Sequence, residues 1–239
     1  MMGVDNDRPV MAITGTSKGL GRAMAEYFVG KGYRVAGCSR GASTLTMEGY
    51  SHSQVDVGDE RQVRTWVRQI RDEFEKVDVL ICNAGAVQSA LLMTVTPDDV
   101  LQTFLRTQVA GTFYVCREIS KLMIARKRGR IITVSSLGVS LHLEGTSAYS
   151  ATKSAVIEMT KILAKELAPL GITCNSFSPA LFMSDSAQAM GEDWSRRLLA
   201  MQTIKRTVSI EEVCHVVSFY ASPESGSITG QVINMGLVC

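Results

Sequence analysis

The chain is predicted to form a doubly wound α/β domain, in which helices cover both faces of a parallel sheet. Short apolar runs typical of buried strands alternate with amphipathic helical stretches from one end to the other. A glycine-rich turn joins the first strand to the first helix. No linker, repeat or shift in composition divides the 239 residues, so we expect a single domain over residues 1–239.

The first strand, turn and helix form the most informative unit. Residues 9–14 read as a buried strand, and residues 22–28 carry apolar positions at helical spacing. Between them, Gly15 permits a tight turn, Gly19 lets the backbone approach a phosphate, and Gly21 lets the helix lie close to the strand. The free N–H groups of the helix start suit a pyrophosphate. Taken alone, the motif fits an ordinary loop as well as a nucleotide site.

The remaining elements follow in alternation. Further strands are predicted at 33–38, 53–57, 77–82, 130–135, 172–177 and 231–235, and helices at 59–76, 97–125, 148–167 and 209–221. Residues 182–207 are polar and Met-rich without a clear period, and we expect a mobile segment that can include short helices. Ligands bind at the carboxyl ends of such strands, where the chain places Gly15, Ser39, Asp56, Asn83, Ser136 and Pro179.

The composition narrows the functional classes. Hydrophobic residues make up 46% and charged residues 20%, as in globular proteins, and the net charge of +2 is too small to suggest a nucleic-acid-binding surface. No stretch is long enough to span a bilayer. The six cysteines form no CxxC pair, which argues for a reducing compartment and against disulfides or a metal site. We therefore expect a cytoplasmic protein with no metal, no nucleic-acid partner and no membrane contact.

A tyrosine and a lysine mark the candidate chemistry. Tyr149 and Lys153 lie four residues apart on the predicted helix 148–167, so they face the same side. The reference pKa of tyrosine is about 10, and a nearby ammonium lowers it, which makes a general acid. An isolated Tyr-x-x-x-Lys is more often a surface pair. Here Ser136, at the end of the fifth strand, could also hydrogen-bond a carbonyl oxygen.

With these motifs together, the chain resembles the single-domain short-chain dehydrogenases/reductases over nearly its whole length, and within them the 3-oxoacyl thioester reductases. The matching motifs are Thr14 to Gly21, Asn83-Ala84-Gly85, the set Ser136, Tyr149 and Lys153, and Asn175 with Pro179. Cys82 stands where the family usually has asparagine, and Ala180 where it has glycine. The resemblance implies a Rossmann fold and an oxidoreductase.

The resemblance also implies residue roles. Tyr149 would donate a proton to the substrate carbonyl, and Ser136 would orient that carbonyl. Lys153 would hold the nicotinamide ribose and lower the pKa of Tyr149. Gln108 stands where the family has an asparagine that serves a proton relay. Glutamine carries the same amide on a longer arm, so a surviving relay is favoured over a slower one or a site that has drifted from catalysis.

The expected cofactor is NADP(H). Ser39 and Arg40 occupy the end of the second strand, where NAD-preferring relatives place an acid, and Lys18 lies inside the glycine turn. Two cations without a carboxylate suit a 2′-phosphate, although both could be ordinary surface residues. The cofactor-binding residues implied are Gly15, Ser17, Lys18, Gly19, Leu20, Gly21, Ser39, Arg40, Asp56, Val57, Asn83, Ala84, Gly85, Tyr149, Lys153, Pro179 and Leu181.

The substrate pocket is expected to be mostly apolar, which favours an aliphatic or aromatic ketone over a sugar. Its predicted lining is Gln88, Leu137, His142, Leu143, Leu181, Met183 and part of 182–207, with His142 as readily a wall as a chemical participant. Relatives that act on carrier protein use basic residues to dock it. Lys127, with Arg126 and Arg128, could serve, although a solvated loop is the favoured interpretation and the second basic position is Leu170.

The sequence therefore predicts an NADPH-dependent reductase that converts a ketone or 3-oxoacyl group to a secondary alcohol. An alternative is a catalytically weak NADP-binding regulatory protein, suggested by Gln108, Ala180 and the unusual apolar ending at residues 235–239. An epimerase with a transient ketone cannot be separated from these by sequence. Helices 97–125 and 148–167 and the last strand are expected to form a homotetramer or dimer.

Overall fold

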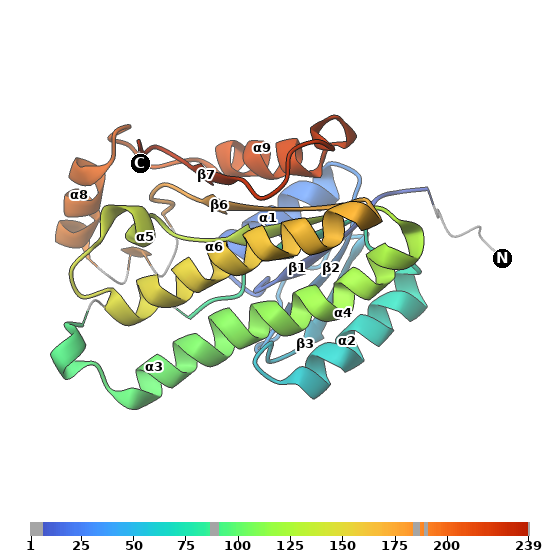
Figure 1. Ribbon diagram of the computed structural model, residues 1–239, viewed down its shortest axis with the longest axis horizontal. Coiled ribbons are helices and arrows are strands. Elements are labelled where there is room, and N and C mark those ends of the chain that lie inside the picture. Colours follow the sequence, from blue (N-terminus) through green and yellow to red (C-terminus); the bar gives the residue numbers. More distant parts are fainter. Residues whose placement is uncertain (1–6, 87–90, 184–186, 189–190, 239) are drawn as a thin grey trace.

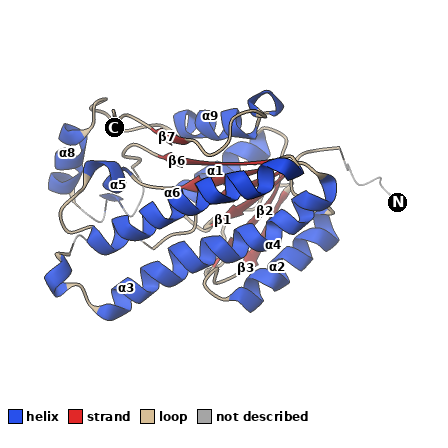
Figure 2. Cartoon of the chain, in the orientation of Figure 1, coloured by secondary structure: helices blue, strands red, loops and turns tan. Residues whose placement is uncertain are grey.

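One parallel sheet contains every strand formed by the described residues, and helices cover both of its faces (Figure 1, Figure 2). This computed structural model describes residues 7–86, 91–183, 187–188 and 191–238. The strands are β1 (Val10–Thr14), β2 (Arg34–Ser39), β3 (Tyr50–Gln54), β4 (Val79–Cys82), β5 (Gly129–Val134), β6 (Ile172–Ser178) and β7 (Val232–Asn234). The predicted doubly wound fold class is confirmed.

The strand order is β3-β2-β1-β4-β5-β6-β7. The chain runs outward from β1 to β3 and then returns to β4 on the other side of β1. This reversal opens a crevice at the carboxyl ends of β1 and β4, which is where doubly wound sheets bind ligands.

Two helical layers bury the sheet. The helices α2 (Glu60–Phe74), α4 (Gly111–Arg126) and α6 (Ser147–Leu167) supply one apolar core, while α1 (Gly19–Gly30) and α9 (Ile210–Ala221) supply the other. Side chains of β1 alternate between the layers, because Val10 and Ala12 enter the first core and Met11 and Ile13 the second. Both faces being buried explains why the strands read as continuous apolar runs.

The predicted helix 97–125 is interrupted. It consists of α3 (Asp98–Phe104), a π-helical turn η2 (Leu105–Ala110) and then α4. The π turn carries Gln108, which is buried. Such turns insert a residue into the helical repeat and often occur at functional sites.

The third strand begins and ends three residues earlier than the predicted 53–57. The pattern Val55, Val57 suggested a strand, and both side chains are buried, but β3 ends at Gln54. There the chain turns, because the Asp56 carboxylate accepts a hydrogen bond from the N–H of Gly58. The Asp59 side chain then caps α2 by accepting from the N–H groups of Arg61 and Gln62.

Several short helices were not assigned from sequence. They are η1 (Met93–Val95), α5 (Leu137–Leu141), η3 (Ala168–Leu170), α8 (Glu192–Met201) and η4 (Pro223–Ser225). The helix α8 lies inside the segment 182–207, whose mobility stays a prediction. Leu198 of α8 packs with Leu181 and with Leu141 and Leu143 of the α5 region, so α8 closes one end of the molecule (Figure 1).

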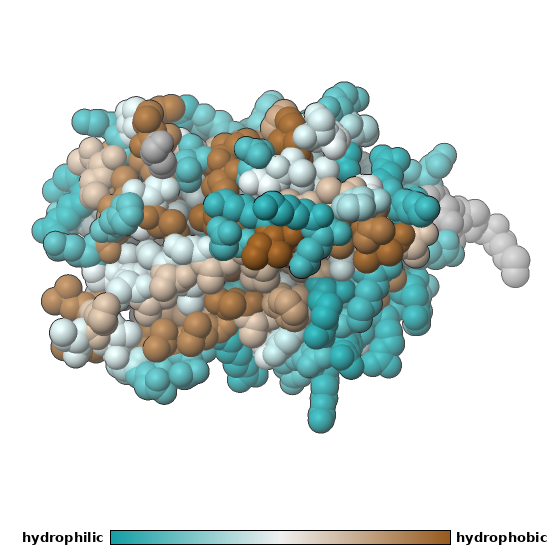
Figure 3. Space-filling model, viewed as in Figure 1, coloured by the Kyte–Doolittle hydropathy of each residue, from teal (hydrophilic) through white to brown (hydrophobic). Residues whose placement is uncertain are grey.

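The outer face of the helical layer bearing α4 and α6 exposes apolar side chains. Leu105, Phe113 and Ile162 are 40%, 47% and 51% exposed. Figure 3 shows brown, hydrophobic side chains over these helices. Among the helices of the described residues, none has the length and apolar character needed to cross a membrane.

Candidate active site

The glycine-rich turn has the conformation that its sequence requires. Gly15 and Gly19 have φ values of +80° and +57°, which favour glycine over other residues. A side chain at Gly21 would overlap the carbonyl oxygen of Gly15, so helix α1 can approach β1 only without one. Asn83 braces the turn, because its side-chain amide donates to the carbonyl of Thr14 at 3.0 Å.

A groove of about 620 Å³ lies beside this turn. Its lining includes the predicted cofactor residues Gly15, Ser17, Lys18, Gly19, Leu20, Gly21, Ser39, Arg40, Asp56, Val57, Asn83, Ala84 and Gly85. The same groove is lined by four residues that were not predicted from the sequence: Gly41, Ala42, Val55 and Thr107. The start of α1 has no side-chain cap, so its first N–H groups are available to an anion.

The charges along the groove favour an anionic ligand. Lys18 and Arg40 are exposed, and neither has an ion-pair partner among the described residues. The carboxylate of Asp56 is already paired with Arg106, at 3.0 Å. The groove therefore presents two cations and one neutralised acid, which fits a phosphorylated ribose better than one with free hydroxyls only.

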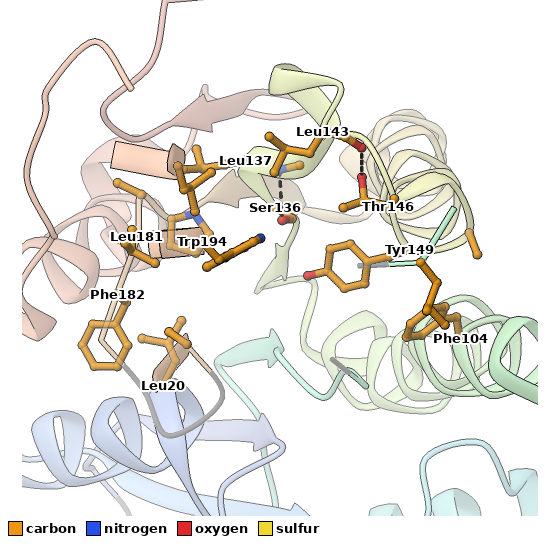
Figure 4. Close-up of a pocket in the computed structure, with 18 of the residues that line it drawn as sticks. Leu20, Phe104, Ser136, Leu137, Leu143, Thr146, Tyr149, Leu181, Phe182 and Trp194 are labelled. Carbon is orange, nitrogen blue, oxygen red and sulfur yellow. Dashed lines mark hydrogen bonds between the residues drawn. The ribbon is translucent and has the colours of Figure 1, made fainter. Parts of the chain in front are cut away.

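Ser136 and Tyr149 line a second cavity, which shares Leu20 with the groove. Ser136 follows β5, and its Oγ accepts a hydrogen bond from the N–H of Gly138 at 3.2 Å. Tyr149 lies in the first turn of α6, and its hydroxyl points toward Ser136 (Figure 4). The ring of Phe104 packs edge-on against the ring of Tyr149, with 5.7 Å between centroids, which fixes the ring orientation.

Lys153 is buried below Tyr149. Its Nζ donates to the carbonyl of Val134 at 2.8 Å and lies 6.0 Å from the centre of the Tyr149 ring. Burial lowers the pKa of Lys153 to about 8, so the ammonium form still dominates at pH 7.

The expectation that Lys153 lowers the pKa of Tyr149 is not met in this structure. Burial raises the pKa of Tyr149, and the hydrogen bond with Ser136 only partly opposes that effect. The ammonium of Lys153 is directed to the carbonyl of Val134. Tyr149 therefore keeps its proton at neutral pH, as a proton donor must.

Gln108 has a defined structural role. Its Nε2 donates to the carbonyl of Ala86 at 2.9 Å, and its Oε1 accepts from the hydroxyl of Thr152 at 2.9 Å. These two hydrogen bonds connect the π turn to the segment after β4 and to Thr152 of α6, which directly precedes Lys153. The longer arm of glutamine is used to reach both partners.

The second cavity has a volume of about 230 Å³ and is mostly apolar. Of the predicted lining, Leu137, Leu143 and Leu181 are present, together with Pro179, while Gln88 lies outside the described residues. The prediction is wrong for His142 and Met183, which are exposed and absent from the described lining. His142 follows α5 with a φ of +50°, and its neighbour Leu143 lines the cavity instead.

Leu20 and Phe104 were not predicted as pocket residues, whereas Phe182 and Trp194 belong to the segment 182–207, part of which was predicted to line the pocket. Leu20, Phe104, Phe182 and Trp194 line the cavity, and the Trp194 indole points into it (Figure 4). Trp194 belongs to α8, in the segment without a clear period, and only its aromatic character there could have drawn attention. Leu20 also lines the groove, so the two cavities are contiguous.

Comparisons with known proteins agree with this geometry. A family model described as enoyl-(acyl carrier protein) reductase matches residues 15–236. The 3-oxoacyl-[acyl-carrier-protein] reductase FabG of Salmonella typhimurium is 31% identical over 232 residues, covering 95% of each chain. The Staphylococcus epidermidis FabG is 31% identical over 236 residues, covering 93% of this chain and 95% of its own.

Two solved structures with NADP or NADPH bound are also similar to this chain. ElxO with NADP bound superposes with a TM-score of 0.88 at 27% identity, covering 95% of this chain and 97% of that one. A variant of actinorhodin polyketide ketoreductase with NADPH also gives 0.88 at 27% identity, covering 97% of each chain.

Proposed function

This chain belongs to the short-chain dehydrogenase/reductase family, and from that premise we propose that it is an NADPH-dependent reductase of ketones or 3-oxoacyl groups. The observation that carries the proposal is the position of the Ser136 and Tyr149 hydroxyls. They line an apolar cavity that shares Leu20 with the groove beside the glycine turn, and the ammonium of Lys153 is buried nearby.

The residues of the groove fit NADP(H). The uncapped start of α1 would hold the pyrophosphate, and Lys18, Ser39 and Arg40 would hold the 2′-phosphate. The structures of ElxO with NADP and of the polyketide ketoreductase with NADPH support this choice. When bound, the nicotinamide supplies the hydride.

The side chains of this site divide the remaining work. Tyr149 donates the proton to the carbonyl oxygen, because burial keeps its hydroxyl protonated at neutral pH. Ser136 hydrogen-bonds the same oxygen and orients it. Lys153 contributes a positive charge and would hold the nicotinamide ribose. Gln108 holds α6 and the segment after β4 together through its two hydrogen bonds.

The substrate class follows from the cavity. Its walls are mainly Leu, Phe and Trp side chains, which favours an apolar chain or ring beside the carbonyl. The FabG relatives are named for 3-oxoacyl-[acyl-carrier-protein] substrates. A small ketone and an acyl thioester both fit this description.

A carrier protein docked at the basic run would be distant from this cavity. Lys127 lies beside Gly171, just beyond the end of α6, whereas Tyr149 is in the first turn of that helix. Leu167 lies 18 residues after Tyr149, which corresponds to about 27 Å along the helix at 1.5 Å per residue. We therefore infer that Lys127 does not dock a carrier protein for the cavity of its own subunit.

A catalytically weak NADP-binding protein is the second candidate, and Gln108 favours it. Both halves of its amide are engaged, by Ala86 and by Thr152, and Lys153 is not one of its partners. A proton relay through Gln108 would have to use the remaining hydrogen or lone pair of that amide.

We further propose that the protein is a cytoplasmic homo-oligomer. The exposed apolar side chains Leu105, Phe113 and Ile162 on the outer helical face suit burial against a second copy (Figure 3). Five buried cysteines remain thiols, which suits a reducing compartment. Light scattering of the purified protein measures the assembly directly.

The test of the proposed function has two stages. Fluorescence titration with NADPH and NADH measures cofactor preference, and NADPH consumption is then followed against a panel of ketones and 3-oxoacyl thioesters. We expect tighter NADPH binding and turnover of at least one apolar carbonyl. NADPH binding without turnover on any panel member would support the second candidate, and preference for NADH would contradict the roles given to Lys18 and Arg40.

A further inference from the structure

A polar cluster lies beside the proposed 2′-phosphate site, and of its side chains only Ser39 has a role in the mechanism above. The Tyr50 hydroxyl lies 2.9 Å from Nδ1 of His52 and 2.9 Å from Oγ1 of Thr16. On the other side of the ring, Nε2 of His52 lies 3.0 Å from the carbonyl of Gly41 and 3.2 Å from Oγ of Ser39. The cluster thus joins the glycine turn to the end of β2.

The sheet makes room for this cluster. His52 of β3 pairs in register with Gly37 of β2. A side chain at Gly37 would lie 2.5 Å from Oγ1 of Thr16 and 2.6 Å from the Tyr50 hydroxyl. Glycine at this strand position therefore permits the close approach of both hydroxyls, which is a recognised reason for glycine within a strand.

The partners fix which nitrogen of His52 carries the hydrogen. A carbonyl oxygen can only accept, so Nε2 must donate to Gly41. In the neutral ring, Nδ1 is then an acceptor with a single lone pair. Because the Tyr50 hydroxyl donates to Oγ1 of Thr16, the Thr16 hydroxyl, at 3.3 Å, is the donor to Nδ1. The Ser39 hydroxyl also donates to the Gly41 carbonyl, at 2.8 Å, so that carbonyl has two donors.

We propose that His52 is a positioning residue for the 2′-phosphate of NADP(H). Because Nε2 keeps the Gly41 carbonyl paired, Ser39 can turn its proton from that carbonyl to a phosphate oxygen. The inference rests on the proposed NADP(H) site, and it makes His52 a determinant of NADPH over NADH, since only NADPH carries a phosphate there.

Two substitutions separate this role from a general structural one. In His52→Gln the amide N–H can reach the position of Nε2, whereas in His52→Asn the shorter amide reaches only toward Tyr50. We expect His52→Asn to raise the NADPH dissociation constant about three- to tenfold, the size of one neutral hydrogen bond. His52→Gln should recover most of this loss, and the NADH dissociation constant should change less than twofold in both.

Fluorescence titrations of the full-length protein with NADPH and with NADH test the proposal. Ser53→Ala is the matched control, because Ser53 is the next residue in β3 and its hydroxyl bonds Gln69 instead. Ser39→Ala should weaken NADPH alone, and combining it with His52→Asn should add little, since both act on one hydrogen bond. If His52→Asn fails to fold, NADPH and NADH titrations of Ser39→Ala, alone and combined with His52→Gln, take its place.

The outcomes are distinct. If wild type does not prefer NADPH, the proposed function fails. If wild type prefers NADPH but His52→Asn binds both cofactors as wild type does, or weakens both equally, this inference alone is overturned. Additive losses in the double variant would also overturn it.

Discussion

The groove and the apolar cavity are built in different ways, although they share one edge of the sheet. Backbone turns and short polar side chains at strand ends make the groove, with Gly15, Ser39 and Asn83 each directly following or ending a strand. The cavity is walled by large side chains from segments far apart in the chain, including Phe104 and Trp194. The groove therefore depends on local backbone conformation, whereas the cavity depends on how distant segments pack.

The largest expected effect is at the boundary of the two regions. Tyr149→Phe removes the proton donor but keeps the ring against Phe104, so kcat should fall roughly 10²- to 10⁴-fold. NADPH titration of the same variant should give a dissociation constant close to that of wild type. Full turnover by Tyr149→Phe would show that another group supplies the proton.

The groove is sharply sensitive to one added methyl group. Gly21→Ala would overlap the Gly15 carbonyl and push α1 from β1, so we expect the NADPH affinity to fall by at least roughly tenfold. Gly30→Ala, at the other end of α1, has nothing within 4 Å of the new Cβ and is the matched control. It should raise the melting temperature slightly, because alanine favours the helix by about 0.5–1 kcal/mol. Equal NADPH binding by both variants would contradict the close approach.

The pH dependence of kcat/KM tests whether the positive charge of Lys153 is required. The pKa of Lys153 is lowered to about 8, while burial raises that of Tyr149. For reduction, kcat/KM should therefore be level below pH 8 and fall about tenfold per pH unit above it, as the ammonium is lost. A profile that stays level up to pH 10 would mean that this positive charge is not required.

The smallest effect is expected in the cavity. Trp194→Ala enlarges the wall and should raise KM for a bulky apolar ketone about three- to tenfold, with little change in NADPH affinity. The matched control is Trp66→Phe, a buried tryptophan of α2 outside both cavities. Substrate and cofactor titrations of each variant measure the split. A loss of NADPH affinity in Trp194→Ala would show that the regions are not separable.

The same contrast explains what sequence could predict. The glycine turn and the Tyr149–Lys153 spacing are local, because the conformation of a few neighbouring residues determines them. The π turn at Gln108 was hidden, since it depends on packing against β4 and α6 and not on its own helical pattern. His52 became significant only when the β2–β3 register placed it opposite Gly37.

The prediction of the residues that line the cavity was partly wrong for a related reason. Leu137 and Leu181 flank strand ends and were predicted, but His142 was assigned by proximity in sequence alone. His142 adopts a left-handed backbone conformation where α5 ends, and helix propensity does not predict where such a residue falls.

The most direct measurement of the central claim follows the hydride itself. NADPH deuterated at the transferable position is incubated with the protein and an apolar ketone or 3-oxoacyl thioester, and the product is analysed by mass spectrometry and NMR. We predict a secondary alcohol with deuterium on the carbinol carbon from wild type, and almost none from Tyr149→Phe. Tight NADPH binding with no labelled alcohol from any substrate would contradict the reductase account.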